Sequence, residues 1–192
     1  MSQPFEIEEN ARRIGNYRWA ETRLFETLGG WVDTVPELDV KTMLGIHCHK
    51  HAWHAELWHE RLPALHEMPA DRLTAPANEA MVRLVEALTE PDSPHQTIEK
   101  LTGVYRLLIP RLIAAYTHHQ TVTKELTDGP TSRALKLILQ DELEDWRKGE
   151  VMLQLLIATP GDAARAATHL QRLESIMVEA GGITGPGAIA PS

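Results

Sequence analysis

The chain has 192 residues, of which 43% are hydrophobic, and a formal net charge of −8 at pH 7. This length suits one domain with a sizeable core, and the negative charge argues against a broad electrostatic grip on nucleic acid or anionic lipid. No apolar run approaches the roughly 20 residues of a membrane span, and the N-terminus lacks the pattern of a secretion signal. The single cysteine, Cys48, excludes an internal disulfide. We therefore expect a cytoplasmic protein that does not act on membranes or nucleic acids.

Hydrophobic residues recur at helical spacing along the chain, and strand alternation is absent, so we predict an all-α protein. We expect one domain over residues 1–180, with a flexible tail over 181–192 because that segment is rich in Gly, Pro and Ala. The architecture that we predict is an antiparallel four-helix bundle with an additional C-terminal helix packed outside it. The four bundle helices are expected over 6–33, 37–62, 95–127 and 131–158.

Proline and glycine mark where these helices are expected to end. Pro63 ends the second helix, and Pro110 is expected to kink the third. The turn Asp128-Gly129-Pro130 separates the third and fourth helices, since Gly favours a helix end and Pro a helix start. Residues 67–95 are expected to be irregular apart from a short amphipathic helix over 78–88. A break at Pro160-Gly161-Asp162 precedes the fifth helix, which ends near residue 180.

The core-facing stripe of the second helix is interrupted by histidines. His47, His51 and His54 follow one another at steps of four and three residues. Apolar residues continue the same stripe on both sides, which marks it as the buried face. Burying a polar group without a partner costs roughly 1–3 kcal/mol. Neighbouring helices, or a metal ion, must therefore supply partners at this depth.

Candidate partners can be found by matching levels across the two predicted hairpins. A short loop makes the first two helices antiparallel neighbours, so Glu21 falls level with His51. By the same rule Glu142 falls level with Tyr116, and His119 lies about a turn away. If the hairpins pack together, one polar layer is expected to contain Arg18, Glu21, His47, His51, His54, Tyr116, His119, Glu142 and Asp145.

This arrangement resembles the ferritin-like superfamily, and its first, second and fourth helices are most similar to the phenylacetyl-CoA epoxidase subunit group. Di-iron members of the superfamily carry a Glu from each of two helices and a Glu-x-x-His pair from each of the other two. Glu21, His54 and Glu142 match three of these positions. The resemblance implies a ferritin-like bundle and an iron centre, in a group that contains both catalytic subunits and subunits that have lost the metal.

The chain also departs from the superfamily pattern. His51 stands where the family has Glu, and Asp145 stands where it has His. Tyr116 or His119 occupies the level at which the third helix should offer Glu. With few bridging glutamates, one ion is easier to accommodate than a symmetric pair.

Two functions from different classes fit these residues. In the first, the protein is an iron-dependent oxidoreductase whose iron reacts with O₂ or peroxide, with Tyr116 as a nearby catalytic donor or radical site. Its metal ligands would come from Glu21, His51, His54, Glu142, Asp145, His119 and His47. In the second, the protein is a non-catalytic ferritin-like scaffold or partner subunit whose centre is a salt-bridge and hydrogen-bond network. An Arg18 guanidinium bound to Glu21 would favour this second function.

A third function is a thiol-transferase-like bundle with a mononuclear three-histidine metal site. Such ligands normally come from different helices, whereas the three histidines here share one helix. No residue pattern identifies the small-molecule substrate. Trp53 and Trp146 fall partly outside the inner stripes, so we expect a homodimer or a complex with a related ferritin-like subunit.

Overall fold

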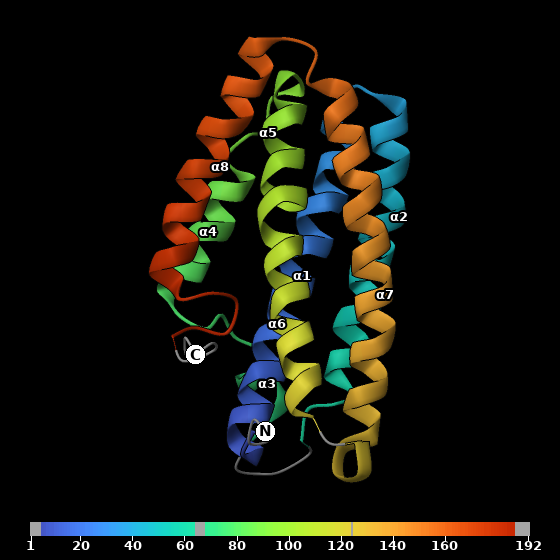
Figure 1. The fold of residues 1–192 in the computed structure, drawn as a ribbon, viewed down its shortest axis with the longest axis vertical. Coiled ribbons are helices and arrows are strands. Elements are labelled where there is room, and N and C mark those ends of the chain that lie inside the picture. The colour runs from blue at the N-terminus through green and yellow to red at the C-terminus, as the bar shows by residue number, and fades with distance from the viewer. Residues whose placement is uncertain (1–4, 64–67, 124, 187–192) are drawn as a thin grey trace.

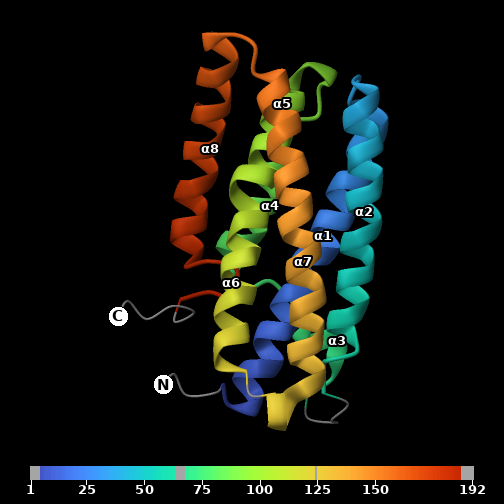
Figure 2. The ribbon, with the colours of Figure 1, turned by 45° about the vertical axis from the view of Figure 1, so that its right-hand side comes forward.

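The structure, a computed structural model, describes residues 5–63, 68–123 and 125–186, and these residues form helices and no β-strand. The all-α prediction is therefore confirmed for the part of the chain that is described. Long helices run along the longest axis of the molecule (Figures 1 and 2). They are α1 (Ile7–Thr34), α2 (Leu38–His59), the composite α5 (Thr97–Thr102), η2 (Gly103–Leu108) and α6 (Ile109–Val122), and α7 (Glu125–Leu156).

The long helices form a bundle in which neighbours run antiparallel. α1 and α2 pack along their length, α2 packs against α7, and α6 packs against α7. α1 and α7 run upward in Figure 1, whereas α2 and the α5–α6 helix run downward. The chain must therefore return along the whole bundle between α2 and α5. The elements of this crossover are α3 (Ala70–Leu73), α4 (Glu79–Thr89) and η1 (Pro94–Gln96).

The segment α3, which was not predicted, lies against the first half of α1. The α-carbon of Gly15 faces it so closely that an added Cβ would be 2.0 Å from the Leu73 carbonyl oxygen. The Asn16 side-chain amide donates to the Ala75 carbonyl oxygen at 2.9 Å, and Arg18 Nη1 donates to Thr74 Oγ1 at 2.8 Å. Glycine and these polar side chains thus hold the start of the crossover against the bundle.

The third bundle helix is α-helical at both ends and π-helical in between. Pro110 has no N–H to donate to the carbonyl of the preceding turn, and its ring crowds that turn. The chain widens just before it, and the Ile109 N–H donates to the Val104 carbonyl oxygen in the i→i−5 pattern of a π-helix. The kink expected at Pro110 is therefore a π segment that ends at Leu108, two residues before it.

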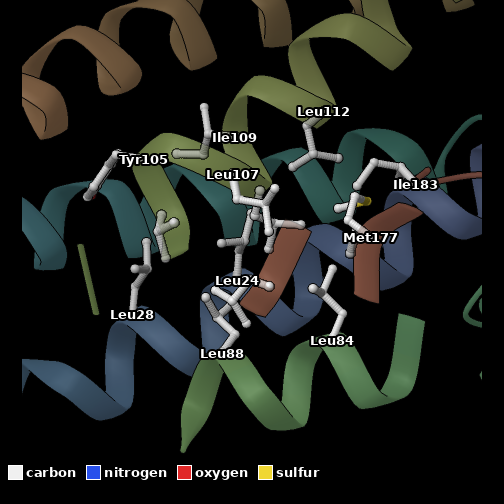
Figure 3. Packing of buried hydrophobic residues seen from close by; sticks show 14 of the residues in the cluster. Leu24, Leu28, Leu84, Leu88, Tyr105, Leu107, Ile109, Leu112, Met177 and Ile183 are labelled. Atoms are coloured by element: carbon white, nitrogen blue, oxygen red, sulfur yellow. The ribbon is translucent and has the colours of Figure 1, made fainter. Parts of the chain in front are cut away.

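A second layer covers one side of the bundle. It consists of α4 and α8 (Pro160–Ala180), which pack against each other, and α8 also contacts α5 and η2. Figure 3 shows side chains of this layer meeting those of α1 and of the η2–α6 region in one apolar core. The labelled residues are Leu24, Leu28, Leu84, Leu88, Tyr105, Leu107, Ile109, Leu112, Met177 and Ile183.

Three boundaries differ from the sequence-based expectation. α6 ends at Val122 and α7 begins at Glu125, so the expected turn at 128–130 is a kink at Asp128 inside α7 and not the gap between two helices. Pro160 is the first residue of α8 rather than part of a break, because Thr159 and Asp162 form a capping box around it. Residues 181–186 pack against the domain: Ile183 and Thr184 are buried, and Arg12 Nη1 donates to the Thr184 carbonyl oxygen at 2.8 Å. Residues 187–192 of the expected tail lie outside the described residues. None of the helices in the described ranges is both long enough and apolar enough to cross a bilayer.

Candidate metal centre

Two glutamates and two histidines meet in the middle of the bundle. α1 contributes Glu21, α2 contributes His51 and His54, and α7 contributes Glu142; all four side chains are fully buried. They come together because the short α1–α2 loop sets Glu21 level with His51, as the count along the two helices predicted. One ligand atom from each residue lies within 4.8 Å of those of the others, so the group could hold a metal ion.

The contacts within the group alternate between acid and base. His51 Nδ1 lies 2.6 Å from Glu21 Oε2 and 3.4 Å from Glu142 Oε1. His54 Nδ1 lies 3.6 Å from Glu21 Oε2 and 3.2 Å from Glu142 Oε1. Ligand atoms of a tetrahedral ion with bonds of about 2.0–2.1 Å lie about 3.3 Å apart. Three of the four separations are close to that spacing, and only the His51–Glu21 hydrogen bond must lengthen.

Two buried atoms of the group have no hydrogen-bond partner among the described residues. They are His51 Nε2 and Glu142 Oε2. Buried polar atoms are seldom left unpaired, because losing their hydration costs free energy that nothing returns. The centre therefore has unused capacity beyond the four atoms above: Glu142 Oε2 could join Oε1 in binding an ion, and a water could satisfy His51 Nε2.

Charge is shared within the group. Burial favours the neutral form of Glu21, but His54 and His51 outweigh it and lower the Glu21 pKa. Burial opposes protonation of His54, yet Glu21 and Glu142 hold its pKa well above the ordinary value. Burial and repulsion from Glu21 raise the pKa of Glu142. The metal-free centre is thus a network of ionised and proton-sharing groups rather than a set of isolated charges.

Tyr116 of α6 contacts the centre through one of its carboxylates. Its hydroxyl donates to Glu21 Oε1 at 2.6 Å, while Glu21 Oε2 faces the histidines. Burial, together with Glu21 and Glu142, raises the Tyr116 pKa well above its ordinary value. Tyr116 therefore remains protonated. Its hydrogen bond to one oxygen of Glu21 orients the other oxygen, which could coordinate an ion.

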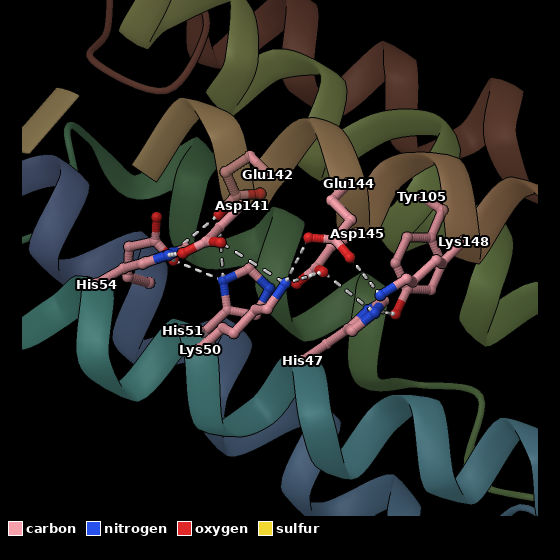
Figure 4. A network of polar contacts seen from close by, with 11 residues as sticks. His47, Lys50, His51, His54, Tyr105, Asp141, Glu142, Glu144, Asp145 and Lys148 are labelled. Atoms are coloured by element: carbon pink, nitrogen blue, oxygen red, sulfur yellow. Dashed lines mark hydrogen bonds and ion pairs between the residues drawn. The ribbon is translucent and has the colours of Figure 1, made fainter. Parts of the chain in front are cut away.

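A second polar cluster adjoins the centre one helical turn along α2 (Figure 4). His47 Nε2 lies 3.3 Å from Asp145 Oδ1, and His47 Nδ1 forms a 2.7 Å hydrogen bond with the Tyr105 hydroxyl. Lys50 Nζ lies 2.6 Å from the same Asp145 oxygen. His47 and Asp145, both predicted as candidate ligands, therefore engage each other, Lys50 and Tyr105, and they are not members of the four-residue group.

The Tyr105 ring reaches this cluster because α7 has no side chain in its way. A Cβ on Gly149 would lie 2.1 Å from Tyr105 Cδ1. Burial, together with Asp145 and Glu142, raises the Tyr105 pKa well above the ordinary value. The hydroxyl is therefore a donor or acceptor for His47, not a phenolate.

Two residues expected in the centre lie elsewhere. His119 packs against Phe5 and Tyr17, with ring centroids 5.1 and 5.7 Å away. It follows Tyr116 by almost one turn of α6, so it lies beyond the level of the four-residue group. Arg18 binds Thr74 in the crossover, and no contact with Glu21 is found. The guanidinium that would have favoured a metal-free network is therefore not part of the centre.

Sequence reasoning missed Lys50, Tyr105 and the role of Asp141. Asp141 is a quarter exposed, and its Oδ2 lies 3.3 Å from His54 Nε2, so it joins the buried centre to the surface. Lys50 directly precedes His51, but its partners belong to α7, which no short loop connects to α2. The sign in the sequence was Gly149, because a glycine in a buried helical stripe leaves room for a large side chain of the facing helix.

Comparisons with known protein families, curated proteins and solved structures found no match to this chain.

Proposed function

We propose that Glu21, His51, His54 and Glu142 bind one divalent first-row transition-metal ion. The observation that supports this most directly is that four buried N and O donors lie within 4.8 Å of one another, with further unpaired atoms on His51 and Glu142. Imidazole and carboxylate ligands suit Fe, Mn and Zn, whereas a thiolate, which would favour copper(I) or an iron–sulfur cluster, is absent from the four-residue group.

Iron is the ion that we propose for the native protein, and iron-dependent oxidoreduction is its proposed activity. Bound iron would supply a one-electron couple able to react with O₂ or peroxide. The chain would contribute the rest: Tyr116 holds Glu21 through a hydrogen bond and would be the nearby donor or radical site, and His54 leads to the partly exposed Asp141. A fully buried centre with a protonated tyrosine on one side and a proton path on the other suits this chemistry.

The bundle topology supports the proposed membership of the ferritin-like superfamily. A ferritin-like fold has one long crossover connection between its two hairpins. Here α3, α4 and η1 carry the chain back along the bundle between α2 and α5 (Figure 1). The polar layer also lies midway along the long helices, which is where the superfamily places its metal.

Elemental analysis of protein purified without chelator tests the metal proposal. We expect about one ion per chain, and its loss in Glu21→Ala and His54→Ala. Glu144→Ala is the matched control, because Glu144 lies nearby on α7 but is half exposed. Wild-type protein that stays metal-free after anaerobic addition of Fe²⁺, Mn²⁺ or Zn²⁺ would contradict the proposal.

The oxidoreductase part needs its own test. Iron-loaded wild-type protein should consume peroxide or O₂ faster than Tyr116→Phe, and the variant should retain its iron because Phe preserves the ring packing. Equal rates for wild type, Tyr116→Phe and metal-free Glu21→Ala would leave metal binding standing and remove the oxidoreductase activity.

A metal-free scaffold is the second candidate, and the 2.6 Å His51–Glu21 contact favours it. A contact this short stabilises the centre without an ion and must break for one to bind. Under this alternative, thermal stability would be unchanged by any of the three metals. Under the metal proposal, binding to the folded state alone raises the unfolding temperature.

We also propose that the protein associates with a second copy of itself through the outer faces of α2 and α7. Trp53 and Trp146 are 43% and 36% exposed, and Val151 and Leu155 on α7 are 59% and 74% exposed. Sedimentation at micromolar concentration should show a dimer that Trp53→Glu dissociates. A monomer would leave a related ferritin-like subunit as the partner to be sought.

A further inference from the structure

We propose that the ammonium group of Lys50 occupies a second cation site beside the centre and thereby limits this protein to one bound metal ion. The inference rests on the proposed function only for the first ion. The site is formed by three carboxylates of α7 and by His47 of α2. Lys50 would act as the resident cation of this site, and its side chain would determine the metal stoichiometry of the protein.

The surroundings of the ammonium group are those of a small cation. Lys50 Nζ lies 2.6 Å from Asp145 Oδ1, 3.6 Å from Glu144 Oε2 and 3.8 Å from Asp141 Oδ1. These three residues lie on one face of α7, since they follow one another at steps of three and one. Figure 4 shows the ammonium group between this face and α2.

The cluster holds more coordinating capacity than an ammonium group uses. Asp145 is 1% exposed, and its Oδ2 has no hydrogen-bond partner among the described residues. His47, also 1% exposed, adds a ring nitrogen 3.3 Å from the other Asp145 oxygen. Lysine offers only a point charge with three donors, whereas a divalent cation can engage both oxygens of a carboxylate and a neutral imidazole.

The ligand set also indicates which ion would replace the lysine. Three carboxylates and one imidazole suit Mn²⁺ or Fe²⁺ better than a soft ion. With Lys50 in place, an incoming divalent ion would meet a positive charge at contact distance in a partly buried setting, where screening is weak. The lysine therefore excludes a second ion by charge as well as by volume.

The experiment compares the number of Mn²⁺ ions bound per chain in wild-type protein and in Lys50→Met, by elemental analysis after equilibration with Mn²⁺ and removal of free ion. Methionine preserves the side-chain length and removes the charge. We expect about one ion in the wild type and about two in Lys50→Met. Lys50→Arg keeps a cation and should bind about one ion, as should Lys148→Met, in which an exposed lysine bonded to the same Glu144 is removed.

The outcomes separate this inference from the proposed function. If wild-type protein binds no ion and Lys50→Met binds one, the second site stands and the Glu21 centre does not hold metal. If folded Lys50→Met binds the same number of ions as wild-type protein, Lys50 does not occupy a metal site. Lys50→Gln, which keeps an amide donor for Asp145, replaces Lys50→Met if that variant does not fold. Added Mn²⁺ should also raise the unfolding temperature of either variant more than that of the wild type.

Discussion

Two clusters of acids and bases lie one turn apart on α2, and they balance their charges differently. Around His51 and His54, the positive charge comes from imidazoles, which can lose a proton and become metal ligands. Around Asp145, it comes from Lys50, which cannot coordinate while it stays charged. Both clusters contain buried carboxylates and histidine, so residue type alone does not decide which of them can take up an ion. What decides it is whether the resident cation is an imidazole or an ammonium group.

The largest effect is expected from removing an acid of the buried centre. Glu21→Ala leaves His51 and His54 with Glu142 as their remaining buried acid and deprives the Tyr116 hydroxyl of its acceptor. Breaking a buried charged network by deleting one member costs about 3–5 kcal/mol. Urea unfolding of metal-free protein measures this loss. A variant within 1 kcal/mol of the wild type would mean that the centre is not charged in the folded state.

A second variant tests the support of the neighbouring cluster. Gly149→Ala places a Cβ 2.1–2.4 Å from three Tyr105 ring atoms, so the ring must move and its bond to His47 must break. We expect a loss of about 3 kcal/mol, at the upper end for overpacked cores, with metal binding at the Glu21 centre retained.

Gly45→Ala in α2 is the matched control, because no atom lies within 4 Å of its added Cβ. It should stabilise the helix by about 0.5–1 kcal/mol. Similar unfolding curves for the two alanine variants would show that the Tyr105 ring relaxes at no cost.

The third prediction concerns a histidine that faces aromatic rings instead of carboxylates. Burial and the nearby Arg13 lower the pKa of His119 to about 4 in the folded protein, whereas a histidine in the unfolded chain has the ordinary pKa of 6.5. Between these values the unfolded chain binds more protons, so the contribution of His119 to stability is present above pH 6.5 and declines as the pH falls. Relative to His119→Leu, wild-type protein should lose about 2 kcal/mol between pH 7 and pH 5.

Urea unfolding of both proteins at pH 7, 6 and 5 measures this difference. His54 should behave in the opposite way, because its pKa is raised and its contribution is lost as the pH rises through that value. A stability gap between wild type and His119→Leu that stays constant with pH would contradict a neutral, buried His119.

The smallest effect is expected at the solvent side of the Lys50 cluster. Glu144 is half exposed and contacts both Lys50 and Lys148. Exposed ion pairs contribute up to about 1 kcal/mol, so Glu144→Ala should reduce the free energy of unfolding by less than that. A loss above 2 kcal/mol in a urea titration would mean that Glu144 belongs to the buried network and not to its rim.

Sequence reasoning succeeded where a short loop fixes the alignment of two helices. Counting back from the α1–α2 loop placed Glu21 level with His51, and the two atoms lie 2.6 Å apart. Counting from the turn at Gly129 placed Tyr116 and Glu142 in the same layer. Apolar stripes predicted the helices themselves to within a few residues, except at the third helix and the crossover.

The errors arose where alignment depends on packing between distant segments. Lys50 and Asp145 belong to α2 and α7, which no short loop connects, so their level could not be counted. His119 shares the buried stripe of Tyr116 but lies almost one turn farther along α6, beyond the level of the four-residue group. The π segment and α3 depend on Pro110 and on the close approach at Gly15, neither of which changes the hydrophobic pattern.

The π segment Gly103–Leu108 has a consequence for the length of the chain. Each of its hydrogen-bonded loops closes one residue more than in an α-helix, and each residue of an α-helix turns the chain by about 100°. Residues on either side of it therefore present different stripes, one toward α8 and one toward the Glu21 centre. Deleting a single residue here would restore a regular helix and rotate Tyr116 away from Glu21 or Leu101 away from its neighbours. The third helix should therefore tolerate many substitutions in this segment but no change in its number of residues.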